Sequence, residues 1–335
     1  MLEYAELCAS SNFSFLRAAS HPHELIERAA ALQYRALAIT DYNSLAGIVR
    51  AHIAAKKLGF KFHPGCRLTL FPGSWPQLKE LLQHTSYEKV RKFTVFVYPT
   101  CLNSYGNLSQ LLTTGKLRAP KGECYLTTDD FRSNTGGFVV IIALPEDFYP
   151  KKTQISDKFL TFCKELKDTI PRSHLSIAIK RDFTFYSIAE ERVAAELSER
   201  FSIPPVASNM PLFHIPERKA LHDVLSCIRK GCTLDQAGCL LLQNAERHLK
   251  PPAVMAKLFS DHPEALKRTT ELSDLLSDFS LENLHYEYPE PTNATGDKAI
   301  NHLKALVWQK AVKRYPAGVP LKVRRLLKEE LKLIE

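Results

Sequence analysis

The 335-residue sequence has no apolar run near the length of about 18–20 residues that a membrane-spanning helix requires. Its first six residues include two glutamates and lack the basic-then-apolar order of a secretory signal peptide. Both absences argue against an exported or membrane-embedded protein. We therefore expect a cytoplasmic protein without a membrane partner.

Familiar catalytic and metal-binding motifs are also missing. The chain has no G-x-S-x-G nucleophile turn, no Walker phosphate loop and no G-x-G-x-x-G dinucleotide motif. Its eight cysteines include no C-x-x-C pair, and Cys227, Cys232 and Cys239 lack zinc-ribbon spacing. We interpret the cysteines as reduced thiols of the core.

Positive charge is concentrated toward the C-terminal end. The net charge is +9, and residues 298–335 hold ten Lys and Arg against three Glu. Clustered cations are what contacts with nucleic-acid phosphates require. The candidates for such contacts are Lys322, Arg324, Arg325 and Lys328. The alternative is an ordinary solvated helix face, on which Glu329 and Glu330 lie beside the cations.

Short apolar runs of strand length alternate with amphipathic segments over most of the chain. The predicted strands are 36–40, 61–70, 93–98, 138–144, 175–179 and 205–208. Ser20 can cap the first helix, and a helix over 44–58 is closed by Gly59. Repeated strand–helix units predict parallel strands with helices outside, in a barrel or a doubly wound sheet. Ligands bind such sheets at the carboxyl ends of the strands.

After Phe213 the pattern becomes helical. The predicted helices are 216–229, 253–259, 264–276, 297–314 and 320–334. The segment 286–296 is predicted to be a linker because it contains Pro289 and Pro291.

A set of short stretches occurs in a characteristic order along the whole chain. They are YAEL (4–7), SNFSFL (11–16), ALAITD (36–41), SLAGIV (44–49), GKLRAPKGEC (115–124), ASN (207–209), LHDVLSCIR (221–229), NAERHL (244–249), YEYP (286–289) and AVKRYPAGVP (311–320). The ordered set resembles the beginning of the bacterial error-prone C-family DNA polymerases, paralogues of the DNA polymerase III alpha subunit.

The resemblance implies an α/β fold: a PHP-type (polymerase and histidinol phosphatase) distorted (β/α)7 barrel followed by a helical segment. It implies a PHP domain over residues 1–285, with a barrel core over about 1–215 and a helical extension over about 216–285. A linker at 286–296 and the truncated start of the polymerase palm at 297–335 follow.

The resemblance also indicates that the metal ligands of the PHP domain have been lost. Active PHP domains hold divalent metals with His, Asp and Glu at strand ends, where the metals activate water. The aligned positions here hold Cys8, Ser10, Arg17, Tyr42, Arg67, Met210 and Leu212. Asp41 is the one carboxylate left at these strand ends. We therefore expect no metal, no cofactor and no catalytic residue in this chain, whereas Mg²⁺ is expected in the palm of the full polymerase.

Two details of this interpretation concern cations and histidines. We hypothesise that Arg17 or Arg67 pairs with Asp41 and replaces the positive charge of a metal, because a guanidinium binds a carboxylate with two hydrogen bonds. The alternative is that both arginines point to solvent. His21-Pro22-His23 is the one H-x-H stretch in the chain, but it lies at a helix start and we interpret it as structural.

The implied function is that of a non-catalytic PHP domain of an error-prone translesion DNA polymerase, with a structural or interaction role in DNA repair and damage-induced mutagenesis. Expected partners are the downstream palm domain, DNA, accessory mutagenesis proteins and the sliding clamp. One alternative is a metal-dependent phosphoesterase or 3′–5′ exonuclease of the PHP family. Another is a stand-alone binding module.

Overall fold

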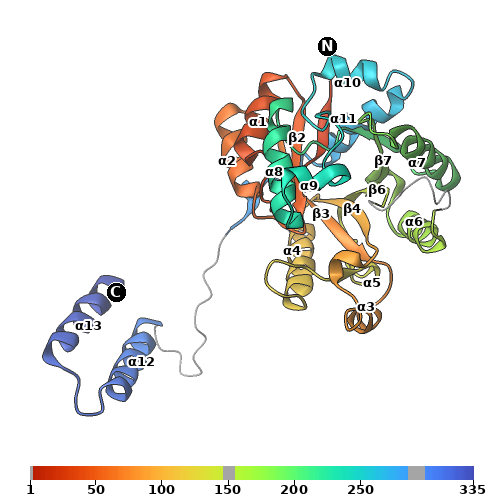
Figure 1. Cartoon of the computed structure of the whole chain (residues 1–335). Helices are drawn as coiled ribbons and strands as arrows, with labels where there is room; N and C mark the ends of the chain where they lie inside the picture. Colours follow the sequence, from red (N-terminus) through yellow and green to blue (C-terminus); the bar gives the residue numbers. More distant parts are fainter. Residues whose placement is uncertain (1–2, 146–154, 286–298) are drawn as a thin grey trace. The chain divides into compact units, whose positions relative to one another are not determined.

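The computed structural model describes residues 3–145, 155–285 and 299–335. The chain divides into two compact units, Met1–Leu284 and His285–Glu335. The first unit contains the sheet and helices α1 to α11, and the second contains α12 and α13 (Figure 1). The predicted linker at 286–296 lies outside the described residues.

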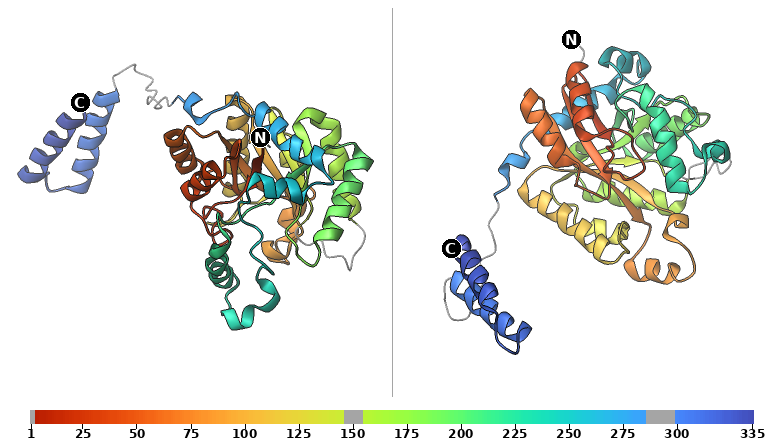
Figure 2. Two further views of the ribbon diagram at one scale, coloured as in Figure 1. Left: turned by 90° about the horizontal axis from the view of Figure 1, so that it is seen from above. Right: turned by 60° about the vertical axis from the view of Figure 1, so that its left-hand side comes forward.

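Seven strands follow one another around a nearly closed barrel, in the order β1-β2-β3-β4-β6-β7-β8, and a short eighth strand, β5, pairs with β3. The strands are β1 (Ala5–Ala9), β2 (Ala36–Tyr42), β3 (Phe62–Phe71), β4 (Phe93–Pro99), β5 (Leu126–Thr127), β6 (Phe138–Ala143), β7 (Leu175–Lys180) and β8 (Pro205–Ser208). Helices lie outside these strands (Figure 2). The expected PHP-type distorted barrel is confirmed.

The strand directions are mixed. β1, β2 and β3 are parallel, as are β6, β7 and β8, but β4 is antiparallel to both β3 and β6. The prediction of parallel strands is therefore wrong for β4. A parallel connection needs a crossover helix that carries the chain back along the strand. The seven-residue helix between β3 and β4 covers only about 10 Å, whereas the ten-residue β3 extends about 33 Å. This helix is therefore too short to carry the chain back to the start of β3.

The first unit has eleven helices among its described residues. They are α1 (Pro22–Ala31), α2 (Ile48–Leu58), α3 (Trp75–Leu81), α4 (Leu102–Leu117), α5 (Thr128–Arg132), α6 (Asp157–Thr169), α7 (Ser187–Phe201), α8 (Lys219–Lys230), α9 (Leu234–Ala237), α10 (Pro252–Leu258) and α11 (Pro263–Leu275). β4 and β6 are buried along their whole length. After the last strand, α11 returns to β1, where Ala5 N donates to Thr269 Oγ1 at 3.3 Å.

Two predicted helix starts are wrong. His21, not Ser20, is the N-cap of α1, because the Ser20 hydroxyl is held by His214 instead, at 2.7 Å between Oγ and Nδ1. The second helix begins at Ile48 rather than at Ser44, and it ends at Gly59 as predicted, with a φ of 60° at that glycine. The prediction that all cysteines belong to the core also fails, since Cys101 and Cys239 are exposed.

The second unit is a pair of helices, α12 (Ala299–Arg314) and α13 (Leu321–Ile334), as predicted. They contact each other, and Lys304 Nζ lies 2.9 Å from a carboxylate oxygen of Glu335. None of the helices in the described part of the chain has the length and apolar character needed to cross a membrane.

Candidate metal centre of the barrel

The aligned ligand positions lie near the carboxyl ends of β1, β2 and β8 and in the middle of β3. The parallel register between β2 and β3 places Asp41 beside Cys66 and Tyr42 beside Arg67. Register partners on neighbouring strands project to the same face of the sheet. The sequence-predicted residues Tyr42 and Arg67 are therefore brought into contact by the strand pairing itself.

The ring of Tyr42 binds two guanidinium groups. The guanidinium carbon of Arg17 lies 4.4 Å from the ring centroid and that of Arg67 lies 4.3 Å from it. Arg67 is also held over Phe96, its antiparallel register partner on β4, at 5.5 Å. Cations at such distances are attracted by the negative face of an aromatic ring. Two positive charges thus gather where the PHP pattern requires metal ligands.

Asp41 takes its hydrogen bonds from serines. Its Oδ1 accepts from Ser11 N at 2.8 Å and from Ser14 Oγ at 2.6 Å, and its Oδ2 accepts from Ser11 Oγ at 2.7 Å. A Cβ on Gly47 would fall 2.5 Å from Oδ2, so that only glycine lets the backbone of α2 approach this closely. The hydrogen bonds to the Asp41 carboxylate thus come from serines, whereas the guanidiniums of Arg17 and Arg67 both lie over the ring of Tyr42.

The Asp41 carboxyl is buried, with 1% of the residue exposed. Burial raises its pKa from the ordinary 3.8 to about 6, and the hydrogen bonds from Ser14 and Ser11 oppose that rise. The serine hydrogen bonds therefore compensate only in part for the hydration that the charged Asp41 carboxylate loses on burial.

A second buried carboxylate, Glu6 on β1, was not identified from the sequence. It accepts hydrogen bonds from Tyr4 Oη (2.7 Å) and Cys8 N (2.9 Å) within its own strand. It also accepts from Ser208 Oγ (2.6 Å) and Asn209 N (3.0 Å) at the end of β8. The sequence did contain a signal for this site, namely an acid inside the apolar run of residues 4–9, because a buried acid needs hydrogen-bond donors around it.

The remaining aligned positions are engaged in packing and backbone bonds. Cys8 Sγ lies 3.8 Å from Tyr98 Oη, and burial raises the pKa of its thiol. Ser10 Oγ donates to the Thr40 carbonyl at 3.2 Å. After β8, the Met210 carbonyl accepts two hydrogen bonds from the Arg247 guanidinium, at 3.0 and 2.8 Å. Leu212 is buried, and its amide donates to the Arg247 carbonyl at 2.9 Å.

These residues do not fit a divalent metal. A metal-binding cysteine must be a thiolate, which burial of Cys8 disfavours. Thioether and aliphatic side chains at 210 and 212 offer a hard or borderline cation no suitable ligand. The two guanidiniums at Tyr42 add repulsion, and both carboxylates nearby already accept several hydrogen bonds from neutral donors.

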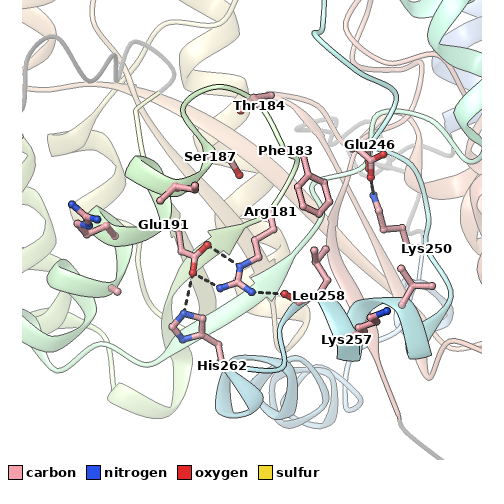
Figure 3. A pocket seen from close by; sticks show the side chains of 14 residues that line it. Arg181, Phe183, Thr184, Ser187, Glu191, Glu246, Lys250, Lys257, Leu258 and His262 are labelled. Carbon is pink, nitrogen blue, oxygen red and sulfur yellow. Dashed lines mark hydrogen bonds and ion pairs between the residues drawn. The ribbon is translucent and has the colours of Figure 1, made fainter.

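A different acidic cluster is formed by α7 and the segment between α10 and α11. Among the described residues, Glu191, Asp261 and His262 form the one group of three whose potential ligand atoms all lie within 4.8 Å of one another. Arg181 pairs with both Glu191 and Asp261 there. Its guanidinium lowers the pKa of the Asp261 carboxyl to about 2. Both carboxylates of the cluster are thus already paired with a fixed cation, as Figure 3 shows for the Arg181–Glu191 contact.

The four candidate nucleic-acid residues all lie exposed on α13. Arg325 Nε donates to Glu329 at 3.1 Å one turn along the helix, so part of its charge is neutralised. Lys322, Arg324 and Lys328 form no ion pair with any residue that the structure describes. These three cations are available to an anionic partner.

Comparison with known proteins relates the chain to a domain family and to a group of polymerases. Residues 7–135 match the PHP domain family. An error-prone DNA polymerase from Caulobacter vibrioides is 39% identical over 332 residues, covering 99% of this chain and 28% of that protein. Another from Brucella abortus is 37% identical over 340 residues, covering 100% of this chain and 29% of that protein.

Among solved structures, an amidohydrolase from Chromobacterium violaceum matches with a TM-score of 0.40 at 14% identity. That match covers 61% of this chain and 86% of the other. The chain spans less than a third of the length of the two polymerases. It contains a PHP domain and is similar, over nearly its whole length, to the part of error-prone DNA polymerases that contains this domain.

Proposed function

We propose that this chain is a non-catalytic PHP domain that acts as a structural part of an error-prone translesion DNA polymerase. The observation that carries the proposal is the convergence of Arg17 and Arg67 on Tyr42, at positions where an active PHP domain needs metal ligands. A divalent cation there would have to displace or approach two fixed positive charges.

The structural role follows from how the polar residues are used. The Glu6 carboxylate joins the first strand to the end of the last one, and the Asp41 carboxylate fixes the 11–14 segment against β2. Both acids therefore hold segments of the barrel together through hydrogen bonds, where an active homologue would use acids at strand ends to hold metals.

The whole polymerase would extend primers on damaged DNA in repair and induced mutagenesis, in the cytoplasm. Its palm, downstream of this chain, would use two Mg²⁺ ions, and neither is expected in this chain. DNA would reach the protein through the full polymerase, with Lys322, Arg324 and Lys328 as phosphate contacts from α13. Accessory mutagenesis proteins and the sliding clamp are the proposed protein partners.

Enzyme assays with Mn²⁺ test whether the chain lacks phosphoesterase and 3′–5′ exonuclease activity. The purified chain is incubated with a chromogenic phosphomonoester and with 3′-labelled single-stranded DNA, beside Asp41→Asn as the matched variant. We expect no product above the level of that variant. Hydrolysis by the wild type that Asp41→Asn abolishes would overturn the proposal in favour of a metal-dependent phosphoesterase or 3′–5′ exonuclease.

The structural role is tested separately, in a polypeptide as long as the error-prone DNA polymerases that this chain resembles. Tyr42→Leu should lower the midpoint of thermal unfolding, while primer extension measured well below that midpoint stays close to wild type. A loss of primer extension without a loss of thermal stability would contradict a purely structural role.

A further inference from the structure

A pocket of about 1010 Å³ lies outside the aligned metal positions, within the first unit. Its walls come from the segment after β7, from α7, from residues 246–250 and from α10. Ile188, Val254 and Leu258 provide apolar lining. In Figure 3 the ring of Phe183 is drawn between the Arg181–Glu191–His262 cluster and the lysines Lys250 and Lys257.

Phe183 is held in a strained and exposed position. Its φ is 51°, a conformation that a bulky residue rarely adopts, and 65% of the residue is exposed. Asn244 Nδ2 fixes the turn by donating to the carbonyls of Asp182 (2.7 Å) and Phe183 (3.2 Å). Strain that neighbouring contacts maintain, on an exposed aromatic ring, points to a role in binding.

The charges of the pocket fall into two groups. Glu191 pairs with Arg181, and Glu246 lies 3.2 Å from Lys250, so each acid of the lining already has a cation as its partner. Arg192 and Lys257 are exposed lining residues, and neither forms an ion pair with any residue in the described ranges. The pocket therefore offers two available cations and no available acid.

We propose that this pocket binds a nucleotide unit of single-stranded nucleic acid. The base stacks on Phe183 above the apolar lining, and the phosphates contact Lys257 and Arg192. Stacking on an exposed aromatic ring beside basic side chains is the usual way in which proteins hold unpaired strands. The volume is ample for a base, a sugar and a phosphate. The site requires no metal and is separate from the basic residues of α13.

The test is the binding of a short fluorescein-labelled oligothymidylate, measured by fluorescence anisotropy in EDTA at several salt concentrations. All proteins carry Lys322→Gln, Arg324→Gln, Arg325→Gln and Lys328→Gln, so that α13 does not contribute to the signal. Phe183→Ala should weaken binding roughly five- to hundredfold, with an unchanged slope of log affinity against log salt. Lys257→Gln should weaken binding and reduce that slope by about 0.7.

Matched controls are Phe185→Ala and Lys164→Gln. Phe185 is 84% exposed on the same loop and Lys164 is exposed on α6, but neither lines the pocket. Both controls should bind as the parent does.

Two results would overturn the proposal. One is a parent protein that does not bind the strand. The other is a Phe183→Ala or Lys257→Gln protein with parental affinity and salt slope. Because the measurement excludes divalent metals, neither result depends on whether the barrel has phosphoesterase activity.

Discussion

The carboxylate of Glu6 on β1 accepts a 2.6 Å hydrogen bond from Ser208 Oγ on β8, and these are the first and last strands of the barrel. The same carboxylate accepts from Asn209 N at 3.0 Å. Nearby, Ser10 N donates to the Pro211 carbonyl at 3.0 Å. The seam of the barrel is thus closed by polar contacts, two of which are made by the Glu6 carboxylate.

Glu6→Gln should destabilise the first unit by about 2–3 kcal/mol. The amide NH₂ of glutamine cannot accept from the donors that Glu6 binds, and a buried donor left without a partner costs about 1–3 kcal/mol. The measurement is the free energy of unfolding in urea. Glu27→Gln, at an exposed position of α1, is the control and should change it by less than about 0.5 kcal/mol. Equal stabilities of the two variants would show that the seam does not depend on Glu6.

Replacement of Tyr42 should reveal the contribution of its two guanidinium contacts. Tyr42→Leu removes the ring face that Arg17 and Arg67 share, whereas Tyr42→Phe retains it. With about 0.5–2 kcal/mol for each cation–π contact, the leucine variant should be less stable than the phenylalanine variant by roughly 1–3 kcal/mol. Thermal and urea unfolding of both variants provide the comparison, and identical values would exclude a stabilising role for these contacts.

The pH dependence of stability should carry the signature of Asp41. Its pKa in the folded protein, about 6, lies above the ordinary value of 3.8, so the folded state holds the proton more tightly. Its contribution to the free energy of unfolding is therefore fully present below about pH 4 and is lost as the pH rises toward 6. The loss should be of order 2–3 kcal/mol.

Asp41→Asn cannot titrate at this position and serves as the reference for that experiment. Urea unfolding of both proteins between pH 4 and pH 7 should give a difference in the free energy of unfolding that changes between about pH 4 and 6 and is constant at higher pH. A constant difference over the whole range would mean that Asp41 keeps an ordinary pKa in the folded protein.

The cations of α13 should differ in their contribution to DNA binding. Arg324→Gln should reduce the slope of log affinity for duplex DNA against log salt by about 0.9, the value for one lost phosphate contact. Arg325→Gln should have a smaller effect, because Arg325 is already paired with Glu329. Filter binding or anisotropy at several salt concentrations measures both, and unchanged slopes for both variants would favour the solvated helix face.

Local patterns predicted much of the fold. Strands such as β2 and β6 are continuous apolar runs, and Gly59 ends α2 with the positive φ that glycine allows. The reversed direction of β4 was not predictable, since an apolar strand reads the same in either direction. Ser20 was misread as a helix cap because its partner, His214, lies far along the sequence.

The candidate site was predictable in its residues but not in its contacts. The positions of Tyr42 and Arg67 in the sequence identified the lost ligands, but only the register of β2 and β3 places them side by side. Asp41 was expected to need a cation, and the hydroxyls of Ser11 and Ser14 supply its donors instead. Glu6 escaped notice because two of its donors, Ser208 Oγ and Asn209 N, lie about two hundred residues away in the sequence.

The metal content of the protein purified without chelators tests the central claim most directly. Inductively coupled plasma mass spectrometry should find far less than one equivalent of zinc, manganese or iron per chain, in wild type and in Asp41→Asn alike. A stoichiometric metal in the wild type that is lost in Asp41→Asn would contradict the account and would show that the barrel retains a metal centre.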